Sequence, residues 1–125
     1  MSDSGTNTEF AKFESTLVVT LLEPQLRDAF TVQQVKESIL AQLKDASVQN
    51  VVLDLGKVEF VGSIAFLAFL GIRRFPTVDK ILLCNLRENV REVFVMCRLL
   101  AGANNPSAPF TEVESVADAL KHLGE

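Results

Sequence analysis

The sequence predicts a single α/β domain built on one mixed, mostly parallel β-sheet with about four helices. Three observations lead to this prediction. Apolar, β-branched segments alternate along the chain with segments whose apolar residues recur every three or four positions. Such alternation requires crossover connections, and therefore parallel strands covered by helices. The chain has 125 residues, of which 48% are hydrophobic, so it can bury the core of one domain of ordinary size.

The N-terminal part of the chain predicts a tail, two strands and a helix. Residues 1–8 are small and polar, and we expect a disordered tail ahead of a domain spanning residues 9–125. Residues 10–22 have the alternation and β-branched content of two strands, and Pro24 ends the second of them. Thr31 and Gln34 then match a capping box, followed by apolar residues at helical spacing. An amphipathic surface helix is therefore expected next.

The remaining segments continue the alternation. The nearly continuous apolar runs VVLDL at 51–55 and KILLCNL at 80–86 are typical of strands buried on both faces of a sheet. Between them lies an apolar helix that closes on Arg73 and Arg74, where cations suit the helix dipole. We expect another helix over 88–99, a loop over 101–109 and a short strand at Phe110. A capping box at 111–114 then starts a last helix, which Gly124 ends.

The composition argues against several functional classes. Sixteen acidic residues outweigh twelve scattered basic ones, which argues against a nucleic-acid partner. The longest uncharged apolar run, residues 60–72, is too short to insert into a membrane, and the polar start lacks a secretory signal, so we expect a cytoplasmic protein. We expect His122 to lie in a last helical turn, and Cys84 and Cys97 to be core thiols. These residues have neither the spacing of metal ligands nor the arrangement of a catalytic base and nucleophile. A binding protein without cofactor, metal or catalytic residues is therefore expected rather than an enzyme.

Three ordered blocks resemble a known family. The stretch VVLDLGKVEFVGSIAFLAFLGIRR at 51–74 combines a strand, a Ser at a turn and an apolar helix closing on Gly-x-Arg-Arg. Together with LCNLRENVREVFVMCRL at 83–99 and FTEVESVADAL at 110–120, it resembles the STAS domain, the fold of bacterial anti-sigma factor antagonists. The resemblance implies partner switching. Such an antagonist binds a serine kinase that otherwise holds a sigma factor inactive, and the kinase phosphorylates it where the helix after the third strand begins.

The sequence departs from the family pattern at that position. The family usually has Asp-Ser-Ser or Asp-Ser-Thr followed by Gly, whereas this chain has Gly62, Ser63, Ile64 and Ala65. The resemblance places Ser63 on the family's first hydroxyl and Ile64 on the phosphorylated position. An isoleucine cannot accept a phosphate, and Gly62 replaces the acidic neighbour. Ser63 is then either an ordinary N-cap of the helix or a displaced phosphate acceptor.

The helix after this turn has two apolar sides. At about 100° per residue, Phe66, Phe69 and Leu70 cluster on one side, and Ile64, Leu67, Ala68, Gly71 and Ile72 on the other. If the first side covers the sheet, the second is an outward stripe for docking a partner, an anti-sigma factor or related serine kinase, or for forming a homodimer. Alternatively, another helix covers it. The predicted partner-binding surface consists of Val61, Gly62, Ser63, Ile64, Leu67, Ala68 and Ile72.

Two rival interpretations remain at this point. VVLDL also resembles the phospho-acceptor strand of response-regulator receivers, with Asp54 as the acceptor. Receivers need an acidic pair after the first strand to bind Mg²⁺, and only Glu23 is available there, so Asp54 is more simply a strand-end residue that stabilises a loop. The second rival is a STAS domain without a phosphorylation cycle, either a scaffold or the small cytoplasmic subunit of a lipid transporter. The loss of the acceptor hydroxyl makes this second rival the main alternative to the leading interpretation, an anti-sigma factor antagonist that acts by binding its partner.

Overall fold

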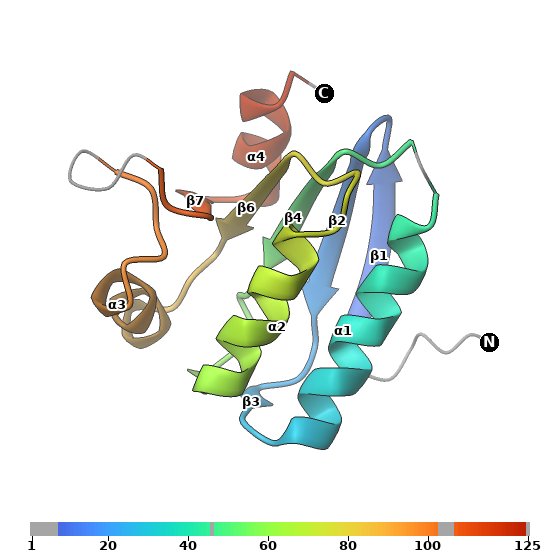
Figure 1. Cartoon of the computed structure of the whole chain (residues 1–125). Helices are drawn as coiled ribbons and strands as arrows, with labels where there is room; N and C mark the ends of the chain where they lie inside the picture. The colour runs from blue at the N-terminus through green and yellow to red at the C-terminus, as the bar shows by residue number, and fades with distance from the viewer. Residues whose placement is uncertain (1–7, 46, 103–106, 125) are drawn as a thin grey trace.

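The computed structural model describes residues 8–45, 47–102 and 107–124 (Figure 1). Its main sheet has the strand order β1-β2-β4-β6-β7, in which β1 pairs antiparallel with β2 and the other neighbours are parallel. The strands of this sheet are β1 Thr8–Phe13, β2 Thr16–Leu21, β4 Asn50–Asp54, β6 Lys80–Cys84 and β7 Thr111–Val113. A separate parallel pair is formed by β3 Gln25–Leu26 and β5 Phe60–Val61. The four helices of the described residues are α1 Ala29–Leu43, α2 Ser63–Arg73, α3 Glu88–Met96 and α4 Val116–His122.

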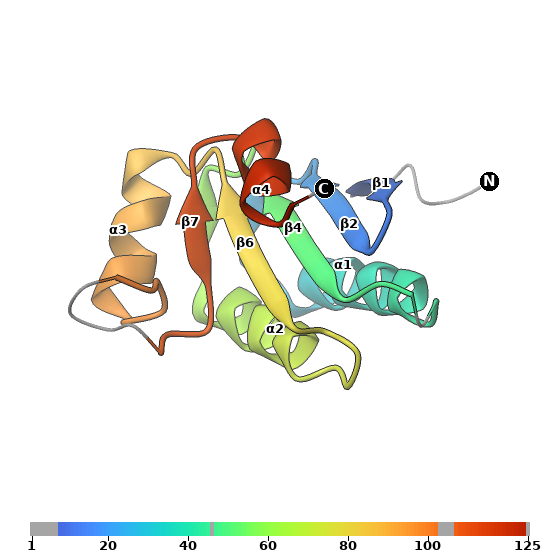
Figure 2. The same ribbon diagram turned by 90° about the horizontal axis from the view of Figure 1, so that it is seen from above.

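The sheet separates two apolar layers. Figure 2 shows α1 and α2 against one face of the sheet, α4 against the other, and α3 beside the β7 edge. Because successive side chains of a strand point to opposite faces, the central strands contribute to both layers. Strand β4, for example, places Val51 and Leu53 in the layer under α1 and α2, and Val52 in the layer under α4. The predicted mixed, mostly parallel α/β fold is confirmed, and the two continuous apolar runs are its central strands.

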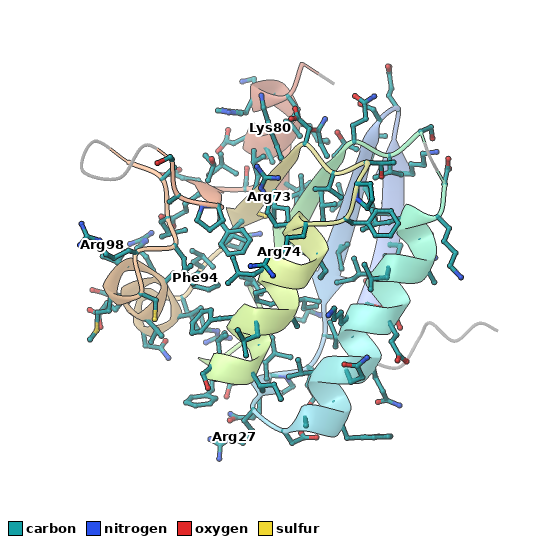
Figure 3. All side chains as sticks on the ribbon, in the orientation of Figure 1. Arg27, Arg73, Arg74, Lys80, Phe94 and Arg98 are labelled. Carbon is teal, nitrogen blue, oxygen red and sulfur yellow. The ribbon has the colours of Figure 1, made fainter. Side chains whose placement is uncertain are left out.

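Helix α3 is joined to α2 through an aromatic cluster. Phe94 is fully buried, and its ring meets that of Phe66 edge-on, with the centroids 4.8 Å apart. Figure 3 shows Phe94 between the two helices. The rings of Phe69 and Phe110 lie 6.4 and 6.1 Å from the same ring. Only Val90 and Phe94 of α3 are buried, so this small helix depends on few contacts.

Both predicted capping boxes are wrong in position. The N-cap of α1 is Asp28, whose carboxylate accepts a hydrogen bond from the Thr31 amide at 2.9 Å, so Thr31 lies inside the first turn. The N-cap of α4 is Ser115, whose hydroxyl accepts from the Asp118 amide at 3.1 Å. Thr111, the predicted cap, lies in β7 because that segment pairs with β6. In both cases the helix uses a nearby Asp or Ser as its N-cap, and these residues are at least as good at capping as the predicted Thr.

Two predicted elements end earlier than expected. Strand β6 ends at residue 84 rather than 86, and α3 ends at residue 96 rather than 99. The positions that follow, Asn85 and Arg98, have φ of 58° and 60°, a left-handed conformation that continues neither a strand nor a helix. Other ends were predicted correctly: Arg74 is the C-cap of α2, and Gly124 follows α4 with φ of 76°.

Parts of two predicted segments lie outside the described residues. Of the expected tail, residues 1–8, only Thr8 is described; it is buried as the first residue of β1. Of the expected loop, residues 103–106 are not described. The segment that follows it confirms a strand near Phe110, since Phe110 bridges to Leu100 and leads into β7.

The two cysteines differ, which corrects the expectation that both belong to the core. Cys84 is buried, and burial, assisted by the charge of Asp54, raises the pKa of its thiol to about 12. Cys97, the C-cap of α3, is exposed. We therefore expect Ellman's reagent at mildly alkaline pH to titrate one thiol in the native protein and two in denaturant, because only a thiolate reacts. Cys97→Ser should abolish the native reaction; rapid reaction of both native thiols would contradict this.

Candidate functional site

The turn into α2 is held by the β3–β5 pair, which lies apart from the main sheet. The Phe60 amide donates to the Pro24 carbonyl oxygen at 3.1 Å, and the Gly62 amide donates to the Leu26 carbonyl oxygen at 2.8 Å. These bonds fix the residues that precede the helix against the segment that leads into α1. Two-residue strands are too short for any periodicity to reveal, and the sequence did not predict them.

Helix α2 begins at the surface of the molecule. Gly62 is its N-cap, with an extended backbone and no side chain to bond the first amides. Ser63 is therefore the first helical residue, which corrects its interpretation as the N-cap, and its side chain is exposed. The first turn of α2 contains no acidic residue. No carboxylate of the first turn therefore offsets the positive end of the helix dipole.

Arg27 and Phe60 flank this turn. The guanidinium carbon of Arg27 lies 4.6 Å from the centroid of the Phe60 ring, a cation–π contact, and Phe60 is 40% exposed. Both residues, together with Gly62, Ser63 and Ile64, line an open hollow of about 450 Å³. Figure 3 shows Arg27 near the end at which α2 begins. No local pattern in the sequence marks Arg27 or Phe60, because they meet only through the β3–β5 pairing.

The exposed face of α2 is narrower than predicted. Leu67 is 68% exposed, and Ile64 is half-buried. By contrast, Val61, Ala68 and Ile72 are 5%, 7% and 0% exposed. The expectation that these three residues form part of an outward surface is therefore wrong. Ala68 and Ile72 pack against the apolar side of α1, and Val61 belongs to the core below the turn.

A second hollow lies between α1 and α2. Its volume is about 330 Å³, and its walls are Ala29, Val32, Gln33 and Lys36 of α1 and Ile64, Leu67 and Ala68 of α2. Ile64 lines both hollows, so they adjoin at this residue. We call Gly62, Ser63, Ile64 and Leu67 the α2 ridge. It is the part of the predicted surface that the fold leaves accessible, with a hollow on either side of Ile64.

The other candidate residues have structural roles or stand apart. One carboxylate oxygen of Asp54 accepts from the Gly56 amide and from the Asn85 side-chain amide, both at 3.0 Å. This confirms Asp54 as a strand-end residue that stabilises the loop. His122 is exposed in the last turn of α4. The described part of the chain contains no group of three or more His, Cys, Asp or Glu side chains placed to hold a metal ion, and none of its helices is long and apolar enough to cross a bilayer.

Comparison with known protein families identifies the fold described above. The family model of the STAS domain matches residues 9–109 of this chain. The chain belongs to the STAS domain family. No curated protein matches its sequence. The α2 ridge is therefore a surface of a STAS domain, at the turn where the family resemblance placed the regulated position.

Several solved structures resemble this STAS domain. An anti-sigma-factor antagonist (STAS) domain protein from Planctomyces limnophilus is 20% identical, with a TM-score of 0.70, and the match covers 93% of this chain and 96% of that one. The Bacillus cell fate determinant SpoIIAA in its phosphorylated form is 18% identical, with a TM-score of 0.64, and coverage of 93% and 98%. The murine anion transporter Slc26a9 is 16% identical, with a TM-score of 0.68; the match covers 91% of this chain but 18% of the transporter. At these identities the likeness shows the fold.

Proposed function

We propose that this STAS domain is a protein-binding module of the anti-sigma factor antagonist type, without enzymatic activity, and that its α2 ridge binds an anti-sigma factor or related serine kinase in the cytoplasm. The observation that carries the proposal is Leu67, a leucine 68% exposed in the second turn of α2, beside a hollow. A large apolar side chain held on a rigid helix next to a concave surface is well suited to bury itself in a partner.

The same geometry favours binding without a phosphate switch at position 64. Ile64 is half-buried between the two hollows, and its alkyl side chain has no oxygen to phosphorylate. Ser63, one residue earlier, is exposed and does carry a hydroxyl. A phosphate there would add about −1.5 to −2 charges to an apolar contact surface and would oppose rebinding. Whether Ser63 is phosphorylated therefore decides whether the protein binds its partner constitutively or under the control of phosphorylation.

Phosphorylation of position 63 or 64 can be measured directly. The protein and its Ile64→Ser variant are incubated with Mg²⁺, ATP and the partner serine kinase, and the tryptic peptide of residues 58–73 is analysed by mass spectrometry. Ser63 is the only hydroxyl in this peptide. We expect no phosphate on the native peptide and a phosphate on the Ile64→Ser peptide, because the variant restores a hydroxyl at the family's position. A phosphate on the native peptide would show that the acceptor is Ser63 and that the switch is intact.

A second candidate function is a STAS scaffold or a transporter-associated STAS subunit. Two observations favour it: Ile64 in place of an acceptor, and the likeness of the whole domain to part of an anion transporter. The neighbouring reading frames separate the two candidates. A serine kinase and a sigma factor encoded beside this chain would support the antagonist, whereas transporter subunits would support the second function.

A further inference from the structure

The two hollows beside the α2 ridge form a groove whose walls carry positive charge only. Arg27 lines one hollow and Lys36 the other, and no Asp or Glu lines either. The chain as a whole has a net charge of −4, so the charge of the groove is opposite in sign to the net charge of the protein. The ion pairs Lys12–Asp45 and Arg91–Glu112 of the described residues involve neither cation.

The two cations stand at opposite ends of the groove. Lys36 reaches from α1 across α2: a Cβ on Gly71 would lie 2.9 Å from its Nζ and 3.0 Å from its Cε. The ammonium group thus lies over α2 where a glycine leaves room for it. Arg27 stands at the other end, over Phe60 and beside Gly62. From Gly62 to Gly71, α2 rises by about 13 Å, at 1.5 Å per residue.

The acidic residues next to these cations in sequence, Asp28 and Glu37, keep their charge but do not line the hollows. The Asp28 carboxylate accepts from the Thr31 amide as the helix cap, which lowers the pKa of that carboxyl. The Glu37 carboxylate accepts from the Gln33 side-chain amide at 2.9 Å. Between its charged ends the floor of the groove is apolar, with Val32, Ile64 and Ala68.

We propose that the groove binds an amphipathic helix of the partner protein, whose apolar residues pack on Ile64 and Leu67 and whose acidic residues lie about two and a half turns apart, one near Arg27 and one near Lys36. This inference rests on the proposed function, because it assigns the chemistry of the partner that the α2 ridge binds. A second copy of this chain fits the groove less well. A twofold contact through the same face would bring these cations against cations of the other copy.

The proposal is tested with a designed peptide of about fourteen residues, roughly 21 Å of helix. It carries Leu at helical positions i, i+3, i+4 and i+7 and Glu at positions i−1 and i+8, which are nine residues and about 13 Å apart. A control peptide has Lys in place of each Glu. Affinities are measured by fluorescence anisotropy at low salt, where exposed charges are least screened. We expect the Glu peptide to bind about tenfold more tightly than the Lys peptide. The double variant Arg27→Glu, Lys36→Glu should reverse this preference.

A matched variant controls for net charge. Lys44→Glu, Lys121→Glu changes the charge of the chain equally, at exposed positions that line neither hollow, and should leave the preference for the Glu peptide unchanged. Circular dichroism checks that both variants are folded. Equal binding of both peptides, binding of neither, or an equal response of the two double variants would overturn the proposal. So would a dimer in sedimentation that Leu67→Glu dissociates, since a second copy would then occupy the groove.

Failure of this proposal and failure of the proposed function give different results. In one case the serine kinase binds the native protein, Leu67→Glu abolishes this binding, and the double variant Arg27→Glu, Lys36→Glu leaves it unchanged. The α2 ridge is then the partner site, and the proposal of an acidic partner helix is wrong. If the Glu peptide binds with the expected preference but the kinase does not bind, the groove has the proposed chemistry and the partner is of another class.

Discussion

Replacing Phe94 with alanine should lower the free energy of unfolding by about 3–5 kcal/mol. Phe94 is fully buried, and its ring contacts aromatic residues from α2 and from the segment before β7, so its removal leaves a cavity at a junction of three parts of the chain. Urea denaturation followed by far-ultraviolet circular dichroism measures the effect. Fluorescence is unsuitable because the chain contains no Trp or Tyr.

Met96→Ala is the matched control on the same helix. Met96 is 81% exposed, so its truncation should change the free energy of unfolding by no more than about 0.5 kcal/mol. Both variants introduce the same residue into α3, and their difference therefore reports the buried contacts. If Phe94→Ala were no more destabilising than Met96→Ala, the attachment of α3 to α2 and to the segment before β7 through the aromatic cluster would be wrong.

The sequence predicted the main architecture because its strongest signals are local. Strands buried on both faces need apolar residues at consecutive positions, and VVLDL and KILLC satisfy this without reference to the rest of the chain. The helix caps were less predictable, because Asp28 and Thr31 are both good N-caps within one turn of each other. Tertiary pairing decided the second case: β7 pairs with β6, so the last helix cannot begin before Ser115.

The accessible part of the site could be predicted only in part, for a physical reason. Every residue from 64 to 72 is apolar, so no polar position marks the outward side of α2. The spacing allowed either side to face outward, and contact with α1 buried Ala68 and Ile72 of the predicted stripe. The small residues Ala65, Ala68 and Gly71 were the available signal, since small side chains on a helix permit close approach of a neighbour. The cations of the groove gave no signal, because only the folded chain brings Arg27 and Lys36 beside Ile64.

Replacing Leu67 with glutamate should weaken binding of the partner kinase by about thirtyfold or more, equivalent to at least about 2 kcal/mol, the effect of a residue central to an interface. The new carboxylate would have to be desolvated within an apolar contact. The fold should be unaffected, since Leu67 is 68% exposed and its free energy of unfolding should change by no more than about 0.5 kcal/mol. Isothermal titration calorimetry measures the affinity, and urea denaturation measures the stability.

Two further variants make this result specific to the α2 ridge. Met96→Glu introduces the same charge at an even more exposed apolar residue of α3 and should leave the affinity unchanged. Ile72→Glu places an unpaired charge in the core beneath α1 and should unfold the protein, because Ile72 is fully buried. If Met96→Glu weakened binding and Leu67→Glu did not, the partner would bind α3 instead. Leu67 and Ile72 lie on one helix, five residues apart. Loss of binding with the fold intact in Leu67→Glu, and loss of the fold in Ile72→Glu, would separate the surface that a partner contacts from the packing that holds the helix in place.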